Sequence, residues 1–191
     1  LALTLRHPER AMAADSVQYL GLARVLATQG SFGTIADPAQ PELYRTPGYP
    51  ALLALVQPWT SLPAFRLAIV LHAAMLAGTA WLLAAAARAG GYDRAELLAG
   101  LFLLQPVLLV HGLRLGTEAL FTLLLAAVAF LLMRRRGSTA LLALAGLLAG
   151  GTVLVRPIGL VVWIPAVLVA VLLALRSSHR RGALTFAAVA G

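Results

Sequence analysis

Long apolar runs separated by short polar connections make up the chain from residue 64 onward. About 17–25 predominantly apolar residues cross the hydrocarbon core of a bilayer as a helix, and shorter runs do so with interfacial help. The predicted spans are residues 64–87, 94–112, 118–133, 139–155, 158–175 and, incompletely, 183–191. The pattern therefore predicts an all-α fold, a polytopic transmembrane helical bundle.

Residues 6–63 are the most polar region and hold four of the chain's seven acidic residues. The apolar residues that recur there at helical spacing are Val17, Leu20, Ala23 and Leu26. They predict a short amphipathic helix lying at the membrane surface. Glycine and proline residues at 30–41 then predict a loop. A turn at 47–50 starts a second short apolar helix, which Pro58 ends.

The chain therefore divides into two predicted regions. Residues 1–63 hold the end of a first span and an external loop with two juxtamembrane helices, and residues 64–191 form the transmembrane bundle. The chain begins without Met and stops inside an apolar run. We expect it to be a fragment with further helices on both sides.

The arginine residues predict which side of the membrane each connection faces. Eight of them lie in connections that alternation places on one side, namely 88–94, 134–136 and 176–181. Two, Arg114 and Arg156, lie in the connections of the other side. Since Arg-rich connections stay in the cytoplasm, Arg114, Arg156, Glu118 and the segment 6–63 are all expected on the outer face.

Composition excludes several classes of protein. Hydrophobic residues are 61% of the 191, charged residues are 12%, and the mean hydropathy is +0.89; an ordinary soluble domain has about 25% charged residues. The net charge of +8 comes from 15 Arg without Lys, clustered between apolar runs, so no nucleic-acid partner is expected. Cysteine is absent, which excludes disulfides and thiolate chemistry.

The candidate catalytic groups are two carboxylates. Asp15 opens the first surface helix and Glu118 opens a span, directly after Thr117. Each has an ordinary explanation, because acids near a helix N-terminus are favoured by the helix dipole. Each also fits a site at the water–membrane boundary, where a carboxylate takes a proton from an acceptor hydroxyl.

The candidate phosphate-binding groups are Arg45, Arg156 and Arg114, because a guanidinium matches phosphate oxygens. Snorkelling to lipid headgroups is the alternative explanation for Arg45, and interfacial anchoring for Arg156. His72 and His111 have no partner at metal-ligand spacing, and His72 is expected to pack between helices. No metal site and no nucleotide-binding motif is predicted.

Five motifs, taken in order, resemble one family. They are DSVQYL at 15–20, GSFG at 30–33, YRTPGYP at 44–50, LGTEALF at 115–121 and LVRP at 154–157. Together they resemble the GT-C glycosyltransferases, in the bacterial branch related to protein O-mannosyltransferases and the aminoarabinose transferase that modifies lipid A. Two positions depart from the family pattern: Ser16 stands where many relatives carry a second acid, and Glu118 where Asp is frequent.

The resemblance implies a GT-C-like bundle and an inverting transferase of the bacterial inner membrane, with its active site facing outward. It would move a hexose or pentose from a polyprenyl-phosphate donor to a glycan, lipid or protein acceptor. Asp15 falls at the catalytic base position, Arg45 near the donor phosphate and Glu118 at the second acidic position. Tyr19 and Tyr49 are expected to contact substrate. No cofactor is expected, and a divalent metal requirement stays open.

Three other functions stay open. A lipid-linked-saccharide transporter or flippase would bind lipid phosphates without catalysis, and would show ionisable residues buried within its spans. A surface-polysaccharide polymerase or ligase would differ mainly in its acceptor. A purely structural membrane subunit would leave the acids and Arg on one face unexplained.

Overall fold

The computed structural model describes residues 12, 14–57, 63–108, 114–134, 139–161, 163–165, 167–168 and 189. Every helix or strand with named bounds in this part of the chain is an α-helix, as the sequence predicts. Most of the predicted spans 158–175 and 183–191, together with His111 and Pro58, lie outside the described residues. The described residues fall into two compact units, drawn from Leu1–Leu76 with Gln105–Leu120 and from Ala77–Leu104 with Phe121–Gly191.

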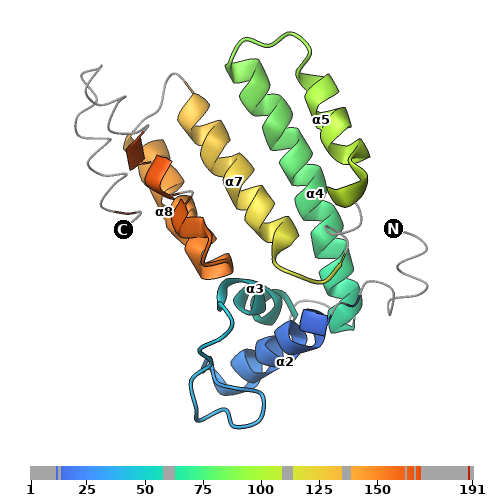
Figure 1. Cartoon of the computed structure of the whole chain (residues 1–191), viewed down its shortest axis with the longest axis vertical. Coiled ribbons are helices and arrows are strands. Elements are labelled where there is room, and N and C mark those ends of the chain that lie inside the picture. The colour runs from blue at the N-terminus through green and yellow to red at the C-terminus, as the bar shows by residue number, and fades with distance from the viewer. Residues whose placement is uncertain are drawn as a thin grey trace. The chain divides into compact units, whose positions relative to one another are not determined.

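In the first unit, helix α2 (Ala14–Gln29) packs against helix α3 (Gly48–Val56), as Figure 1 shows. Asp15 lies in the first turn of α2, where a negative charge is favoured. Gly30 ends α2 with φ +68°, the left-handed conformation that glycine adopts at a helix C-terminus. Pro50 is tolerated in the first turn of α3, where its missing N–H has no helical partner.

Helix α2 buries one face in the first unit. The residues of α2 that the first unit buries most deeply are Ser16, Tyr19, Leu22 and Ala23. Of the residues whose spacing predicts the helix, Ala23 is buried and Val17 is 61% exposed. Apolar residues occur all round this helix, so spacing alone does not select the face that α3 and α4 cover at Tyr19. The contact of this helix with a membrane surface stays a prediction.

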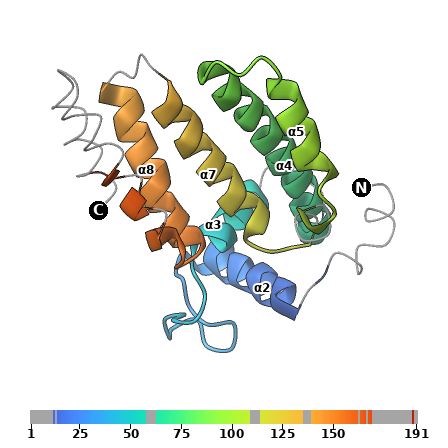
Figure 2. The ribbon, with the colours of Figure 1, turned by 45° about the horizontal axis from the view of Figure 1, so that its top comes forward.

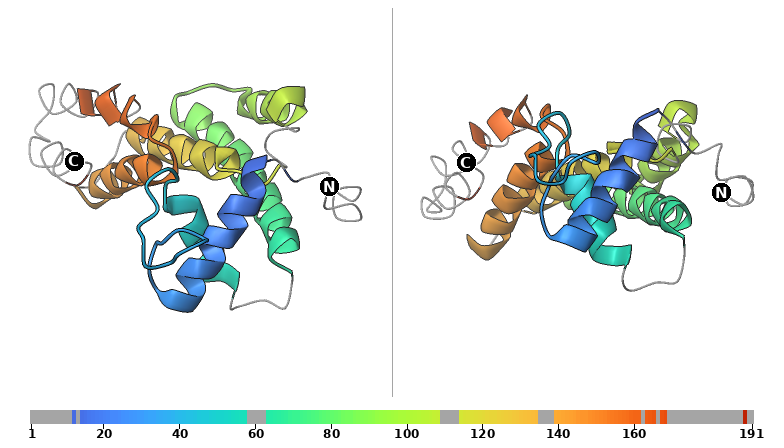
Figure 3. Two further views of the ribbon diagram at one scale, coloured as in Figure 1. Left: turned by 60° about the horizontal axis from the view of Figure 1, so that its bottom comes forward. Right: turned by 90° about the horizontal axis from the view of Figure 1, so that it is seen from below.

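The loop between α2 and α3, which projects from the two helices in Figure 3, is tied together by its own backbone. Thr34 donates its N–H to the carbonyl of Gln40 at 2.9 Å, and Glu42 donates to Phe32 at 3.1 Å. A Cβ at Gly33 would collide with the carbonyl of Pro38, so only glycine fits there. The loop predicted from its Gly and Pro content therefore has a defined course that leads to Arg45.

Helix α4 (Ala64–Ala89) is long and apolar enough, by length and composition, to cross a membrane. Among the described residues it is the one helix that meets this criterion. Its first half contributes Ala68 and Ile69 to the interior of the first unit. The observed bounds differ by two residues at one end from the predicted helix 64–87.

The second unit holds the rest of α4 with α5 (Ala95–Leu104), α7 (Glu118–Met133) from Phe121 onward, and α8 (Thr139–Val155). Helices α7 and α8 have the same bounds as the predicted helices, and they lie side by side in Figure 2. Helix α5 ends at Leu104. Gln105 is not helical, and residues 106–108 are helical again, so the predicted span 94–112 is divided at this point. The Gln105-Pro106 pair thus interrupts the helix where a kink was predicted.

Small residues form the packing surface of α8. Ala145 and Ala149, four residues apart, are fully buried against Val128 and Leu131 of α7. Small side chains at this spacing let two helices approach closely. The sequence predicted this role for the neighbouring pair Gly146 and Gly150, one position further along the helix.

Candidate functional site

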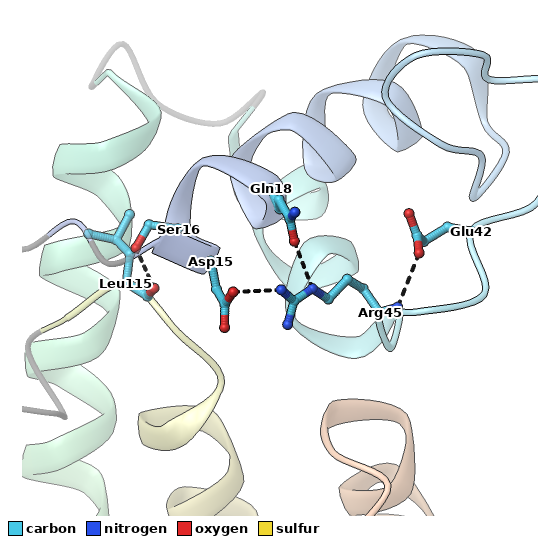
Figure 4. Close-up of polar contacts among 6 residues, drawn as sticks. All are labelled: Asp15, Ser16, Gln18, Glu42, Arg45 and Leu115. Atoms are coloured by element: carbon cyan, nitrogen blue, oxygen red, sulfur yellow. Dashed lines mark hydrogen bonds and ion pairs between the residues drawn. The ribbon is translucent and has the colours of Figure 1, made fainter.

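Asp15 and Arg45, thirty residues apart in sequence, form an ion pair. The Arg45 Nη2 atom lies 2.5 Å from Asp15 Oδ1, and the two side chains are 27% and 54% exposed (Figure 4). Asp15 comes from the first turn of α2, and Arg45 from the end of the loop that precedes α3. The carboxylate and the guanidinium that the sequence singled out are therefore in direct contact, and both are accessible to water.

Two further side chains hold Arg45. Its Nε donates to Gln18 Oε1 at 2.8 Å, and Gln18 follows Asp15 by one helical turn (Figure 4). The carboxylate of Glu42 accepts the backbone N–H groups of Tyr44, at 2.7 Å, and Arg45, at 3.2 Å. The Glu42 bonds thus fix the backbone from which the Arg45 side chain extends. The guanidinium itself bonds to Gln18 through Nε and to Asp15 through Nη2, and its planar array of five N–H donors suits a multi-oxygen anion.

Electrostatics keep Arg45 charged. Partial burial lowers the pKa of its guanidinium, but the hydrogen bond and negative charge of Asp15, with smaller contributions from Tyr19, outweigh that effect and raise the pKa above its ordinary value. The guanidinium also lies over the ring of Tyr19, 5.4 Å from its centroid. Arg45 is therefore a permanent cation at the rim of the first unit.

Beneath this cation lies a column of three rings. Tyr19 and Tyr49 meet edge to face, with centroids 5.5 Å apart and planes at 88°. Tyr49 meets His72 at 5.5 Å, and its hydroxyl shares a 2.8 Å hydrogen bond with His72 Nε2. Tyr49 and His72 are both fully buried. His72 has the packing role expected from the sequence, with Tyr49 as its hydrogen-bonding partner.

Glu118 lies within electrostatic reach of this column. Burial first, and then the charges of Glu118 and Tyr19, raise the pKa of Tyr49 well above its ordinary value. The Glu118 carboxylate folds back over Gly116, where a Cβ would collide with it. The structure thus brings Glu118 into the same unit as Asp15 and Arg45.

Ser16 connects α2 to the segment that precedes α7. Its Oγ donates to the carbonyl of Leu115 at 2.8 Å, and both residues are buried (Figure 4). A second acid at this position would place a carboxylate in a buried site opposite a carbonyl oxygen, which is unfavourable. A serine at position 16 therefore fits this buried contact, whereas an acid would not.

The other two candidate cations have different surroundings. Arg114 is exposed in the first unit, just before α7. Arg156 belongs to the second unit, where its guanidinium lies 6.0 Å from the ring centroid of Phe121. Arg45, of the three predicted phosphate-binding residues, lies in direct contact with the candidate base Asp15.

A cavity of about 600 Å³ lies on the other face of α2. Its lining from α2 includes Val17, Leu20 and Arg24, about half a helical turn away from Asp15 and Gln18. Leu53 of α3 and Ala64 of α4 close it. Neither Asp15 nor Arg45 lines this cavity, so the ion pair is a separate feature of the first unit.

Two residues that contact Arg45 were not predicted as site residues from the sequence, namely Gln18 and Glu42. Gln18 was detectable, because a residue three positions after Asp15 shares its helix face. Glu42 had no such signal, since its role depends on the course of the loop. No cluster of three or more His, Cys, Asp or Glu side chains that could hold a metal ion occurs in the part of the chain that the structure describes.

Comparison with protein-family models, with curated proteins and with solved structures finds no match for this chain.

Proposed function

We propose that this chain is part of an outward-facing, multi-span glycosyltransferase of the bacterial inner membrane, which moves a sugar from a polyprenyl-phosphate donor to an acceptor hydroxyl. The observation that carries the proposal is the Asp15–Arg45 pair, a carboxylate and a guanidinium in direct contact and open to water. A base and a phosphate-binding cation are the two groups that this reaction needs. The membrane supplies the donor, so no nucleotide-binding fold is required.

The proposed reaction proceeds in one displacement. Asp15 takes the proton of the acceptor hydroxyl while that oxygen attacks the anomeric carbon. The bond between this carbon and the phosphate oxygen breaks, and its electron pair stays on the phosphate. Because attack comes from the side opposite the leaving group, the anomeric configuration inverts. Arg45 stabilises the negative charge that the departing phosphate gains.

The ion pair explains how binding and catalysis are coupled in this proposal. With no donor bound, the Asp15 carboxylate is engaged by the Arg45 guanidinium. A donor phosphate competes for the Arg45 guanidinium, whose planar fork suits phosphate oxygens. Displacement of Asp15 from Nη2 frees its carboxylate for the acceptor hydroxyl. Gln18, on Nε, keeps the guanidinium in place during the exchange.

The experiment uses the full-length protein in lipid vesicles, with synthetic polyprenyl-phosphate sugars and a mixture of glycan, lipid and peptide acceptors. Wild-type protein is expected to transfer sugar, and Asp15→Asn to lower the rate by about 10²- to 10⁴-fold, the range of general base catalysis. Donor binding should persist in that variant. Glu96→Gln, an exposed acid of the second unit, is the matched control and should transfer normally. Transfer by Asp15→Asn at the wild-type rate would contradict the proposal.

A further inference from the structure

The buried bond between Tyr49 and His72 joins α3 to α4 inside the first unit. Both side chains are 0% exposed, and the bond length from Tyr49 Oη to His72 Nε2 is 2.8 Å. Burying a hydroxyl and an imidazole is unfavourable unless they are hydrogen-bonded, whereas two apolar side chains would fill the space without this requirement. A directional bond at this position fixes the orientation of both rings, which apolar packing does not do.

The orientation of Tyr49 determines that of Tyr19. The edge of one ring meets the face of the other at 88°, so rotation of Tyr49 about its own axis would break the contact. Tyr19 is itself 8% exposed and has little room to move independently. Its ring in turn lies under the guanidinium of Arg45, at 5.4 Å. Three successive contacts therefore run from α4 to the cation of the candidate site.

We propose that Tyr49 and His72 are positioning residues: their buried hydrogen bond holds Tyr19, and through Tyr19 the guanidinium of Arg45, in the orientation that receives an anionic group. This inference rests on the proposed function for the identity of that group, a donor phosphate. Tyr49 does not touch substrate, because its hydroxyl is buried and bonded to His72. Burial first, and then the nearby Glu118, raise the pKa of the Tyr49 hydroxyl, which is protonated at neutral pH and so maintains the bond.

Tyr49→Phe removes the hydroxyl and keeps the ring. In the full-length protein we expect the donor KM to rise about tenfold, the factor that corresponds to one net hydrogen bond, while the acceptor KM does not change. His72→Leu should have the same effect. His72→Gln should restore donor binding, because an amide can keep the bond to the Tyr49 hydroxyl. Tyr92→Phe, an exposed tyrosine of the second unit, is the matched control.

A double-substitution cycle separates positioning from a general loss of structure. If Tyr49 acts through Arg45, the donor effect of Tyr49→Phe disappears in the Arg45→Ala background. An equal effect in both backgrounds would overturn the inference, and so would an unchanged donor KM in Tyr49→Phe. Absence of transfer by the wild-type protein with every donor would instead refute the proposed function. The two failures are thus distinguishable.

Discussion

The two units of this chain have different interiors. In the first unit, buried polar side chains pair across elements distant in sequence: Ser16 with Leu115, and Tyr49 with His72. In the second, the buried residues of the described apolar clusters are alanine, valine and leucine, with Phe130 and Trp163 packed against them. Two threonines, Thr79 and Thr152, are also buried there, and the Thr152 hydroxyl bonds to the carbonyl of Ala149 within its own helix. The ion pairs follow the same division, since Arg88–Glu96 joins two exposed residues across one short turn.

This difference indicates which unit carries specific chemistry. Apolar packing tolerates substitution when volume is conserved, whereas buried polar pairs require defined partners and geometry. A chain needs such pairs where side chains must be held in one orientation. The first unit therefore has the properties of a site, and the second those of a scaffold. Substitutions in the two units test this distinction.

Arg45→Ala should lower the rate of sugar transfer by the full-length protein about 10²- to 10³-fold, the usual cost of removing one donor to a developing negative charge. Arg88→Ala, which removes the arginine of the exposed ion pair in the second unit, should leave the rate unchanged. Initial rates with saturating acceptor measure both. Equal loss in the two variants would abolish the distinction between site and scaffold.

Ser16→Ala should destabilise the protein by about 1–3 kcal/mol, because the buried carbonyl of Leu115 loses its donor. Thr152→Ala should cost less, since that bond lies within one helix and links no separate elements. Thermal unfolding in detergent micelles compares the two variants. A larger loss for Thr152→Ala would mean that the second unit depends more on polar contacts than its interior suggests.

The pH dependence of stability should carry a contribution from Tyr49. Its pKa is raised above the ordinary value of 10.0, so the unfolded chain loses this proton first as pH rises. Below about pH 10 the group is protonated in both states and contributes no pH dependence; above it, the free energy of unfolding falls by up to about 1.4 kcal/mol per pH unit. Melting curves from pH 9 to 11 should lose this slope in Tyr49→Phe and keep it in Tyr92→Phe.

Glu96→Gln should have no measurable effect on stability. Both members of the Arg88–Glu96 ion pair are exposed and screened by solvent. Melting temperatures at low and high salt should be the same for this variant and the wild type. A salt-dependent loss would show that the turn between α4 and α5 contributes more than its exposure suggests.

Much of the local structure was predictable from single residues and their spacing. Glycines and prolines at 30–41 marked a loop, Gln105-Pro106 marked an interruption, and uninterrupted apolar runs marked α7 and α8 to the residue. These features depend on backbone geometry and hydrogen bonding within a few positions. The face that α2 buries was not predictable from spacing, because several of its faces are apolar and the choice depends on α3 and α4.

The candidate site was predictable only in its parts. Asp15 and Arg45 were identified as separate groups, one for each motif, and their contact depends on how the loop returns to α2. The contacts of Gln18 and Glu42 with Arg45 depend on the same path of the loop, and so does the bond between Tyr49 and His72. Whether the second unit's Arg156 serves a phosphate stays a prediction, as do the outward orientation and the number of spans.

The amino-acid sequence by itself determined that this chain is helical, the bounds of α7 and α8, and which charged side chains lie between the apolar helices, because these properties follow from local periodicity and composition. The tertiary structure decided which of those side chains meet. Contacts over thirty to a hundred residues depend on the path of the whole chain, and no spacing rule along the sequence encodes that path.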